Sequence, residues 1–374
     1  MVPLARRNLF HDIVRFIATL TGIVFSVVLA TVQLGLFVGF TTATANVIAH
    51  SQADLWIKSH NVAYLEAAVP FSAQKQYQVL GTPGVARVEK YIVQFGDWKL
   101  PNGAVVGVML IGFNPDASMG GPWNLTVGHF ADVKAADTVI VDELYGAKLG
   151  VTRPGQSVEM RGYRARVVGF TRGIRTFTTY PTVFTSFKNA QNYAGIQADH
   201  TLYLLVRAVP GTDIQALKAR LLRRVPDVDV LTTAEWRRTQ QRYWMFGTGA
   251  GFTVLLAASL GVLVGGVVVA QTIYAATVDH LREYGTLKAM GASNSYLYRV
   301  ILKQAAISGA LGYVVGMALS LGIARLSQQG PTAILVPCWL MGSMFVVTLG
   351  MCMSASMVSI NKVTRLDPVM VFKG

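Results

Sequence analysis

The chain has 374 residues, of which 52% are hydrophobic and only 14% are charged. Soluble globular domains carry about 25% charged residues, so this composition excludes an ordinary soluble protein and indicates membrane spans. The formal net charge of +14 is no sign of nucleic-acid binding, because part of it is the excess of Lys and Arg that flanks spans.

Four apolar segments reach the roughly 20 residues that a helix needs to cross a bilayer. The first, residues 16–40, follows a basic start and precedes Ala43-Thr44-Ala45, which resembles a signal-peptide cleavage site. Its apolar run exceeds the about 7–15 residues of a signal peptide, so we expect a retained anchor. The other predicted spans are residues 246–276, 300–326 and 336–359.

Basic residues near the span ends predict the orientation. They precede the first span, lie between the second and third, and follow the fourth, whereas the link at 327–335 has no charge. Both termini (1–15 and 360–374) and the loop at 277–299 are therefore predicted to be cytoplasmic, with the segment at 41–245 on the opposite face. The basic residues are Arg6, Arg7, Arg15, Arg282, Lys288, Arg299, Lys303, Lys362, Arg365 and Lys373.

The segment at 41–245 contains an internal repeat of one secondary-structure pattern. A pattern of strand, helix, turn and strand occurs at about 50–95 and again at about 198–235. Ser72 starts the first helix, and either Thr212 or Asp213 starts the second, as predicted N-caps. We expect the two units to form one α+β module near the membrane.

Residues 96–197, between the two units, are predicted to form a β-rich insertion. A hairpin is expected near Arg161-Gly162. After the second unit, TTAEWRRTQQRYWMF predicts a helix capped by Thr233. We expect this helix to run directly into the second span and to link the domain rigidly to the membrane.

Motifs of known chemistry are absent from the sequence. It has no phosphate-binding loop, no H-E-x-x-H, no C-x-x-C and no G-x-S-x-G. Asp142 and Glu143 are consecutive in a predicted strand, so their side chains face opposite ways. Cys338 and Cys352 lie about 21 Å apart along one helix and cannot pair. We predict no catalytic residue, no cofactor and no metal in this chain, and energy supplied by another subunit.

Two spans carry glycines at small-x-x-x-small spacing, which allows helices to approach closely. Gly261 and Gly265 lie in the second span, and Gly312 and Gly316 in the third. We expect the third-span pair to pack within one subunit. The seam of a homodimer is predicted mainly on the first and second spans.

A polar stretch, LREYGTLKAMGAS at 281–293, interrupts the apolar segments. Leu281, Tyr284, Leu287 and Met290 have helical spacing, and Gly291 is suited to end the helix. The residues alone leave two interpretations equally open, an interfacial helix and a docking helix for a cytoplasmic partner.

This stretch resembles the signature loop of the FtsX-like, or MacB-type, ABC transporter permeases. The family pattern is roughly R-x-x-E-[FIY]-G-[VIT]-[LM]-[KR]-A-[LM]-G-A-[ST]. The ending at Asp367, Pro368, Phe372 and Lys373 is also similar, whereas Gln304 stands where many members carry Glu. The layout of one span, a large domain and three spans is most similar to DevC-type permeases, which have no fused ATPase.

The resemblance implies a fold of four membrane helices plus an α+β extracytoplasmic domain, with porter-like units and a sabre-like insertion. It implies a homodimer in the bacterial inner membrane, two copies of an ABC ATPase that bind ATP and Mg, and contact with membrane lipid. A periplasmic adaptor and an outer-membrane duct are also implied. The residues expected to couple to the ATPase are Leu281, Arg282, Glu283, Tyr284, Gly285, Leu287, Lys288, Met290, Gly291 and Ala292.

The function that the resemblance implies is export of a lipid-like or hydrophobic substrate, driven by the separate ATPase. The family's substrates also include haem and antibiotics, so efflux of these is an alternative. A second alternative is a regulator that transports nothing and activates a periplasmic cell-wall hydrolase. A membrane scaffold without an ATPase is a third.

Overall fold

The computed structural model describes residues 13–117, 119–279, 285–288, 290–330 and 332–364. The chain divides into two compact units. A helical unit comprises Met1–Gly39, Phe252–Gln328 and Ala333–Gly374, and an α/β unit comprises Phe40–Gly251 and Gln329–Thr332.

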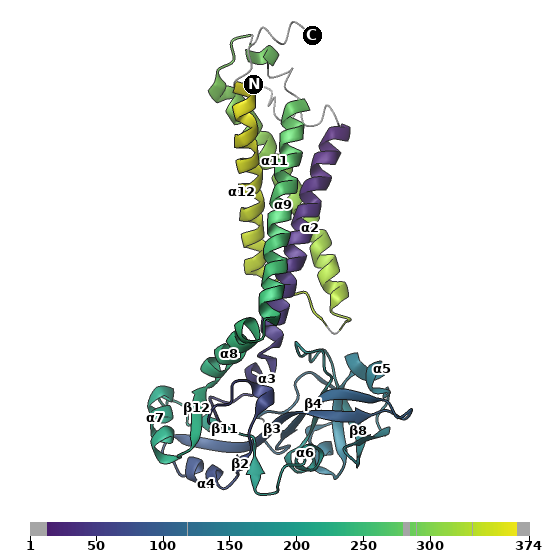
Figure 1. Cartoon of the computed structure of the whole chain (residues 1–374), viewed down its shortest axis with the longest axis vertical. Coiled ribbons are helices and arrows are strands. Elements are labelled where there is room, and N and C mark those ends of the chain that lie inside the picture. Colours follow the sequence, from purple (N-terminus) through teal and green to yellow (C-terminus); the bar gives the residue numbers. More distant parts are fainter. Residues whose placement is uncertain (1–12, 118, 280–284, 289, 331, 365–374) are drawn as a thin grey trace. The chain divides into compact units, whose positions relative to one another are not determined.

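The described helical unit is built mainly from four long helices, which Figure 1 shows. All four are long and apolar enough to cross a membrane, which confirms the predicted number of spans. A small core of residues such as Ile23, Val27, Val269 and Cys352 lies between them. The helices are α2 (Ile13–Ala43), α9 (Ala250–Asp279), α11 (Asn294–Ser327) and α12 (Cys338–Thr364).

The approach to α9 differs from the prediction. Helix α8 (Thr233–Arg242) continues into a π-helical turn, η4 (Tyr243–Gly247), and is then interrupted. Gly249 has a φ of +75°, in the left-handed region that a right-handed helix cannot accommodate. The expectation of one helix running directly into the second span is therefore wrong.

The two repeated units form a four-stranded antiparallel sheet in the order β12-β1-β11-β3. Each helix connects two strands, which gives the ferredoxin-like arrangement β1-α4-β3 and β11-α7-β12. The prediction of two strand–helix–strand units is confirmed. The elements are β1 (Leu55–Ser59), α4 (Lys75–Leu80), β3 (Val85–Lys99), β11 (Tyr203–Ala208), α7 (Ile214–Arg224) and β12 (Val228–Thr232).

One of the predicted helix caps is confirmed and two are wrong. Asp213 caps α7, accepting hydrogen bonds from the amides of Gln215 and Ala216. Helix α4 begins after Gln74 without a side-chain cap, so Ser72 is not its cap. Thr232, rather than Thr233, caps α8, because its hydroxyl and the Glu235 carboxylate form a reciprocal capping box.

The predicted insertion is β-rich, but its strands continue the same sheet. Strand β3 has 15 residues, pairing with β11 over its first part and with β4 (Val105–Phe113) over its second. The path then runs β4-β9-β6-β8-β5, with β7 beside β3 and β8. The hairpin of β7 and β8 turns at Arg161-Gly162 as predicted, with both φ values positive. These strands are β5 (Leu125–Val127), β6 (Thr138–Asp142), β7 (Ser157–Met160), β8 (Tyr163–Thr171) and β9 (Thr182–Ser186).

Two apolar clusters hold the α/β unit together. The smaller lies among β1, β11, β12 and the helices α4 and α7. The larger includes fully buried Trp56 and Trp236 and extends into the insertion. Shorter elements complete the unit: α3 (Asn46–Ala49), η1 (Leu65–Ala67), β2 (Phe71–Ser72), η2 (Phe130–Lys134), η3 (Glu143–Tyr145), α5 (Gly146–Leu149), α6 (Phe187–Ala194) and β10 (His200–Thr201).

Candidate coupling turn and helix-packing faces

The predicted coupling stretch contains a helical turn that closes before α11 begins. Residues 285–288 are helical, and the amides of Met290, Gly291 and Ala292 donate to carbonyls of the preceding turn at 3.0 Å each. Gly291 has a φ of +91°, which a residue with a side chain adopts only with strain. Ser293 then caps α11 by accepting from the amide of Tyr296. We call residues 285–292 the coupling turn.

Apolar residues of the coupling turn point in different directions. Leu287 is half-buried and packs against Leu297 and Ile301 of α11. Met290, in contrast, is 72% exposed. Met290 is therefore the apolar side chain of the described turn that remains accessible to a partner, whereas Leu287 anchors the turn to its own chain.

Other predicted coupling residues are placed as follows. Gly285 is buried, Lys288 and Ala292 are half-buried, and Gly291 is exposed. Leu281, Arg282, Glu283 and Tyr284 lie outside the described residues, as do Asp367, Pro368, Phe372 and Lys373 of the family-like ending.

Both glycine pairs pack against α2 of the same chain. A Cβ on Gly312 would lie 2.5 Å from Ile23 Cγ2, and one on Gly316 would lie 2.8 Å from Val27 Cβ. In the second span, a Cβ on Gly261 would lie 2.9 Å from Gln33 Cγ, and Gly265 lies against Ser26. All four glycines therefore lie against α2 of their own chain.

A buried polar link within the α/β unit was not predicted from the sequence. Gln240 of α8 is fully buried, and its Oε1 accepts from the amide of Leu65 at 2.8 Å. Its Nε2 donates to the Glu66 carboxylate at 3.1 Å. Burial raises the pKa of Glu66, although the Gln240 hydrogen bond opposes that shift. The spacing of Gln240 four residues after buried Trp236 was the available sequence signal.

The described residues contain no group of three His, Cys, Asp or Glu side chains that could hold a metal ion. Asp142 is fully buried and accepts from Thr171 Oγ1 and the amide of Ile174, whereas Glu143 pairs with Arg172. The two carboxylates thus face different partners, but not through strand alternation, because β6 ends at Asp142 and Glu143 begins η3.

Family models match both parts of the chain. The model of the MacB-like periplasmic core domain matches residues 16–224, which is more than half of the chain. The model of the FtsX-like permease C-terminal region matches residues 251–368. The second match includes the coupling turn, α11 and α12.

Individual relatives are distant. An uncharacterised ABC transporter permease of Methanocaldococcus jannaschii is 21% identical over 180 residues, which are 46% of this chain and 44% of that protein. The chain therefore spans less than half of the length of this curated relative. The periplasmic region of MacB from Actinobacillus actinomycetemcomitans has 12% identity and a TM-score of 0.39, covering 52% of this chain and 95% of that one. The extracellular domain of the transporter YknZ from Gram-positive bacteria has 16% identity and a TM-score of 0.36, and the match covers 48% of this chain and 100% of that one.

Proposed function

The chain belongs to the family of ABC transporter permeases with an FtsX-like C-terminal region and a MacB-like periplasmic core domain, and we propose that it transmits ATP-driven movement across the membrane. In this proposal a separate ATPase subunit docks at the coupling turn on the cytoplasmic side. Closure of two ATPases moves the turn and α11, and the movement reaches the α/β unit through α9 and α8. The outcome is export of a lipid-like or hydrophobic substrate.

The observation that carries the docking step is the form of the coupling turn. Its backbone is closed by three hydrogen bonds, Ser293 caps the following helix, and Leu287 packs against α11. Displacement of this turn by the ATPase would therefore move α11 with it, because the turn is ordered and packed against that helix. Exposed Met290 offers an apolar side chain of the kind that anchors an interface.

Transmission to the α/β unit relies on the chain path. Helix α8 immediately precedes η4 and α9, and buried Gln240 ties α8 to Leu65 and Glu66. Movement of α9 would thus act on α8 and on the segment around η1. The π-helical turn and Gly249 interrupt the helix between α8 and α9 along the chain.

The proposed assembly contains two copies of this chain and two ATPases that bind ATP and Mg. A periplasmic adaptor and an outer-membrane duct complete the export path. The assembly lies in a bacterial inner membrane with both termini of the chain in the cytoplasm. A reporter fused at Gly374 should therefore be cytoplasmic, and one inserted at exposed Gly211 should be on the opposite face.

The experiment combines co-purification with the cognate ATPase and ATP hydrolysis in lipid nanodiscs. Met290→Asp should weaken co-purification about tenfold or more, because it places a charge where apolar area is buried. Gly291→Val should leave docking intact but uncouple hydrolysis from movement of the α/β unit, since a β-branched residue opposes a φ of +91°. Gly291→Asn is the matched control, because Asn tolerates positive φ far better than Val.

Asn294→Asp adds the same charge as Met290→Asp close by, at the exposed start of α11, and should leave docking unchanged. If both Met290→Asp and Gly291→Val keep wild-type docking, hydrolysis and transport, the coupling proposal is wrong and the turn is only an interfacial helix. Activation of a cell-wall hydrolase in place of substrate export would replace the transport proposal by the regulatory one.

A further inference from the structure

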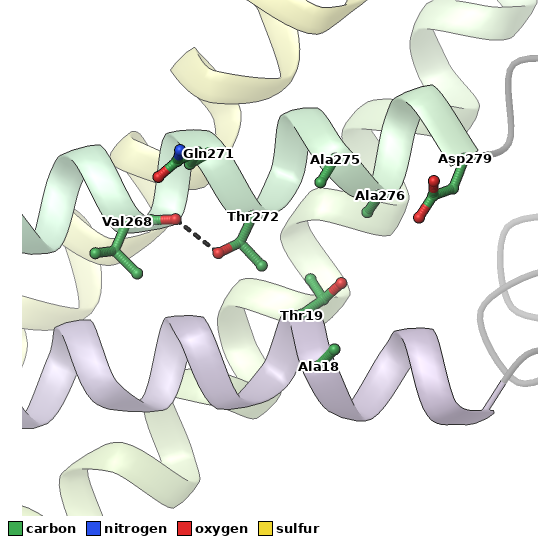
Figure 2. Close-up of a pocket in the computed structure, with 8 residues that line it drawn as sticks. All are labelled: Ala18, Thr19, Val268, Gln271, Thr272, Ala275, Ala276 and Asp279. Carbon is green, nitrogen blue, oxygen red and sulfur yellow. Dashed lines mark hydrogen bonds between the residues drawn. The ribbon is translucent and has the colours of Figure 1, made fainter.

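A groove lies between α2 and α9 in the helical unit (Figure 2). Its volume is about 340 Å³, within the range of small-molecule sites. Thr272 and Thr19 face each other across it, and Asp279 lies at one end. Among the described residues that line it there is no Lys or Arg.

Side-chain size explains why the groove exists. At Gly22 the two helices touch, because a Cβ there would lie only 2.5 Å from Thr272 Oγ1. One turn away on α2 the wall is Ala18, and on α9 it is Ala275 and Ala276. These short side chains leave the space between the two helices unfilled.

The polar side chains of the groove are Thr19, Gln271, Thr272 and Asp279, and of these only Asp279 is a carboxylate. The Thr272 hydroxyl donates to the carbonyl of Val268 at 2.6 Å, so its lone pairs are what it offers to the groove. Asp279, when ionised, accepts only. It is also the single acidic residue among the described residues of the helical unit. The groove therefore suits a ligand that carries N–H donors and a positive charge.

The spacing of these acceptors fits an amphiphile. Seven residues of helix separate Thr272 from Asp279, which is about 10 Å along α9. Val268 continues the groove on its apolar side. The Asp279 carboxylate, at the end of a span, needs a hydrogen-bond donor, because hydrocarbon provides none. A lipid could place its amine at Asp279 and its acyl chains along Val268.

We propose that the groove is a binding site for a membrane lipid with a primary ammonium headgroup, such as phosphatidylethanolamine. The site goes beyond the proposed transport function, since the lipid is a resident ligand and its binding needs neither ATP nor the ATPase. The Asp279 carboxylate binds the ammonium group, and the short side chains of Ala18, Ala275 and Ala276 leave room for the lipid between the helices.

Native mass spectrometry of the purified full chain tests the selection. The probes are phosphatidylethanolamine and phosphatidylcholine with identical acyl chains, which share the phosphate and the positive charge, whereas three N–H donors in the first are N-methyl groups in the second. We expect about a tenfold preference for the ethanolamine lipid, the size of effect that a charge-assisted hydrogen bond provides. Asp279→Asn should reduce the preference to about twofold or less, whereas Asp227→Asn, at an exposed site of the α/β unit, should preserve it.

A steric variant tests the location. Ala275→Leu should fill the groove and lower retention of the ethanolamine lipid about tenfold, a loss comparable to that of the ammonium contact. Ala270→Leu makes the same change at an exposed position of α9 outside the groove and should have no effect. It also controls for folding and insertion.

Three outcomes would overturn the proposal. Equal retention of both lipids by the wild-type chain would show that the site does not prefer a primary ammonium headgroup. An unchanged preference in Asp279→Asn, or unchanged retention in Ala275→Leu, would place any lipid elsewhere. Efficient cross-linking of two chains through Ala275→Cys, with Cys338 and Cys352 replaced, would show that a second copy fills the groove instead.

Discussion

Replacing Gln240 by Leu should detach α8 from the segment that it holds in the α/β unit. Gln240 bridges the amide of Leu65, at 2.8 Å, and the carboxylate of Glu66, at 3.1 Å, from a fully buried position. Leu has a similar volume, so the variant removes both hydrogen bonds without leaving a large cavity. The variant therefore removes hydrogen bonds while it largely keeps the packing.

The magnitude follows from the two partners that remain. A buried amide left without an acceptor costs about 1–3 kcal/mol, and a buried carboxyl that loses its donor costs about as much. The local opening free energy of α8 should fall by about 2–5 kcal/mol. Since each 1.4 kcal/mol is a factor of ten, backbone amides of α8 should exchange with solvent roughly 30-fold faster or more.

The assay is hydrogen–deuterium exchange on the full chain with its ATPase in nanodiscs. Gln215→Leu makes the same substitution on the exposed face of α7 and should leave the exchange of α8 unchanged. We also expect the Gln240→Leu assembly to hydrolyse ATP while its α/β unit loses the nucleotide-dependent change in exchange. Wild-type exchange in α8 would refute the idea that this link holds the helix.

Further predictions concern the buried carboxyl, the glycine faces and the dimer. The pKa of Glu66 is raised in the folded chain, so above about pH 4.5 the folded state holds more protons than the unfolded state, and stability falls as the pH rises through the folded pKa; Glu66→Gln should flatten that slope in urea unfolding measured at several pH values. Gly316→Leu should reduce the yield of folded chain in size-exclusion profiles, because overpacking against Val27 costs about 1–3 kcal/mol or more, whereas Gly322→Leu, with nothing within 4 Å, should not. With Cys338 and Cys352 replaced, Leu260→Cys, 51% exposed on α9, should cross-link two copies, and buried Ala258→Cys should not; monomers throughout would count against the dimer seam.

Features encoded by local patterns could be predicted from the sequence. The four spans follow from length and hydropathy, which are properties of contiguous residues. The Asp213 cap and the Arg161-Gly162 hairpin depend on residues within a few positions of one another. The family-like loop was recognised for the same reason, because its thirteen positions at 281–293 are consecutive.

Features that join distant parts of the chain required the tertiary structure. Gln240 meets Glu66 across 174 positions, and nothing near either residue indicates the other. The glycines of two spans converge on α2, and the groove beside Asp279 exists only because α2 and α9 touch at Gly22 and carry short side chains one turn away. The break at Gly249 also escaped prediction, since glycine is common inside membrane helices and its φ is set by how the chain leaves η4. Periodicity indicates which face of an element is apolar, but the partner of that face depends on packing among segments far apart in the sequence.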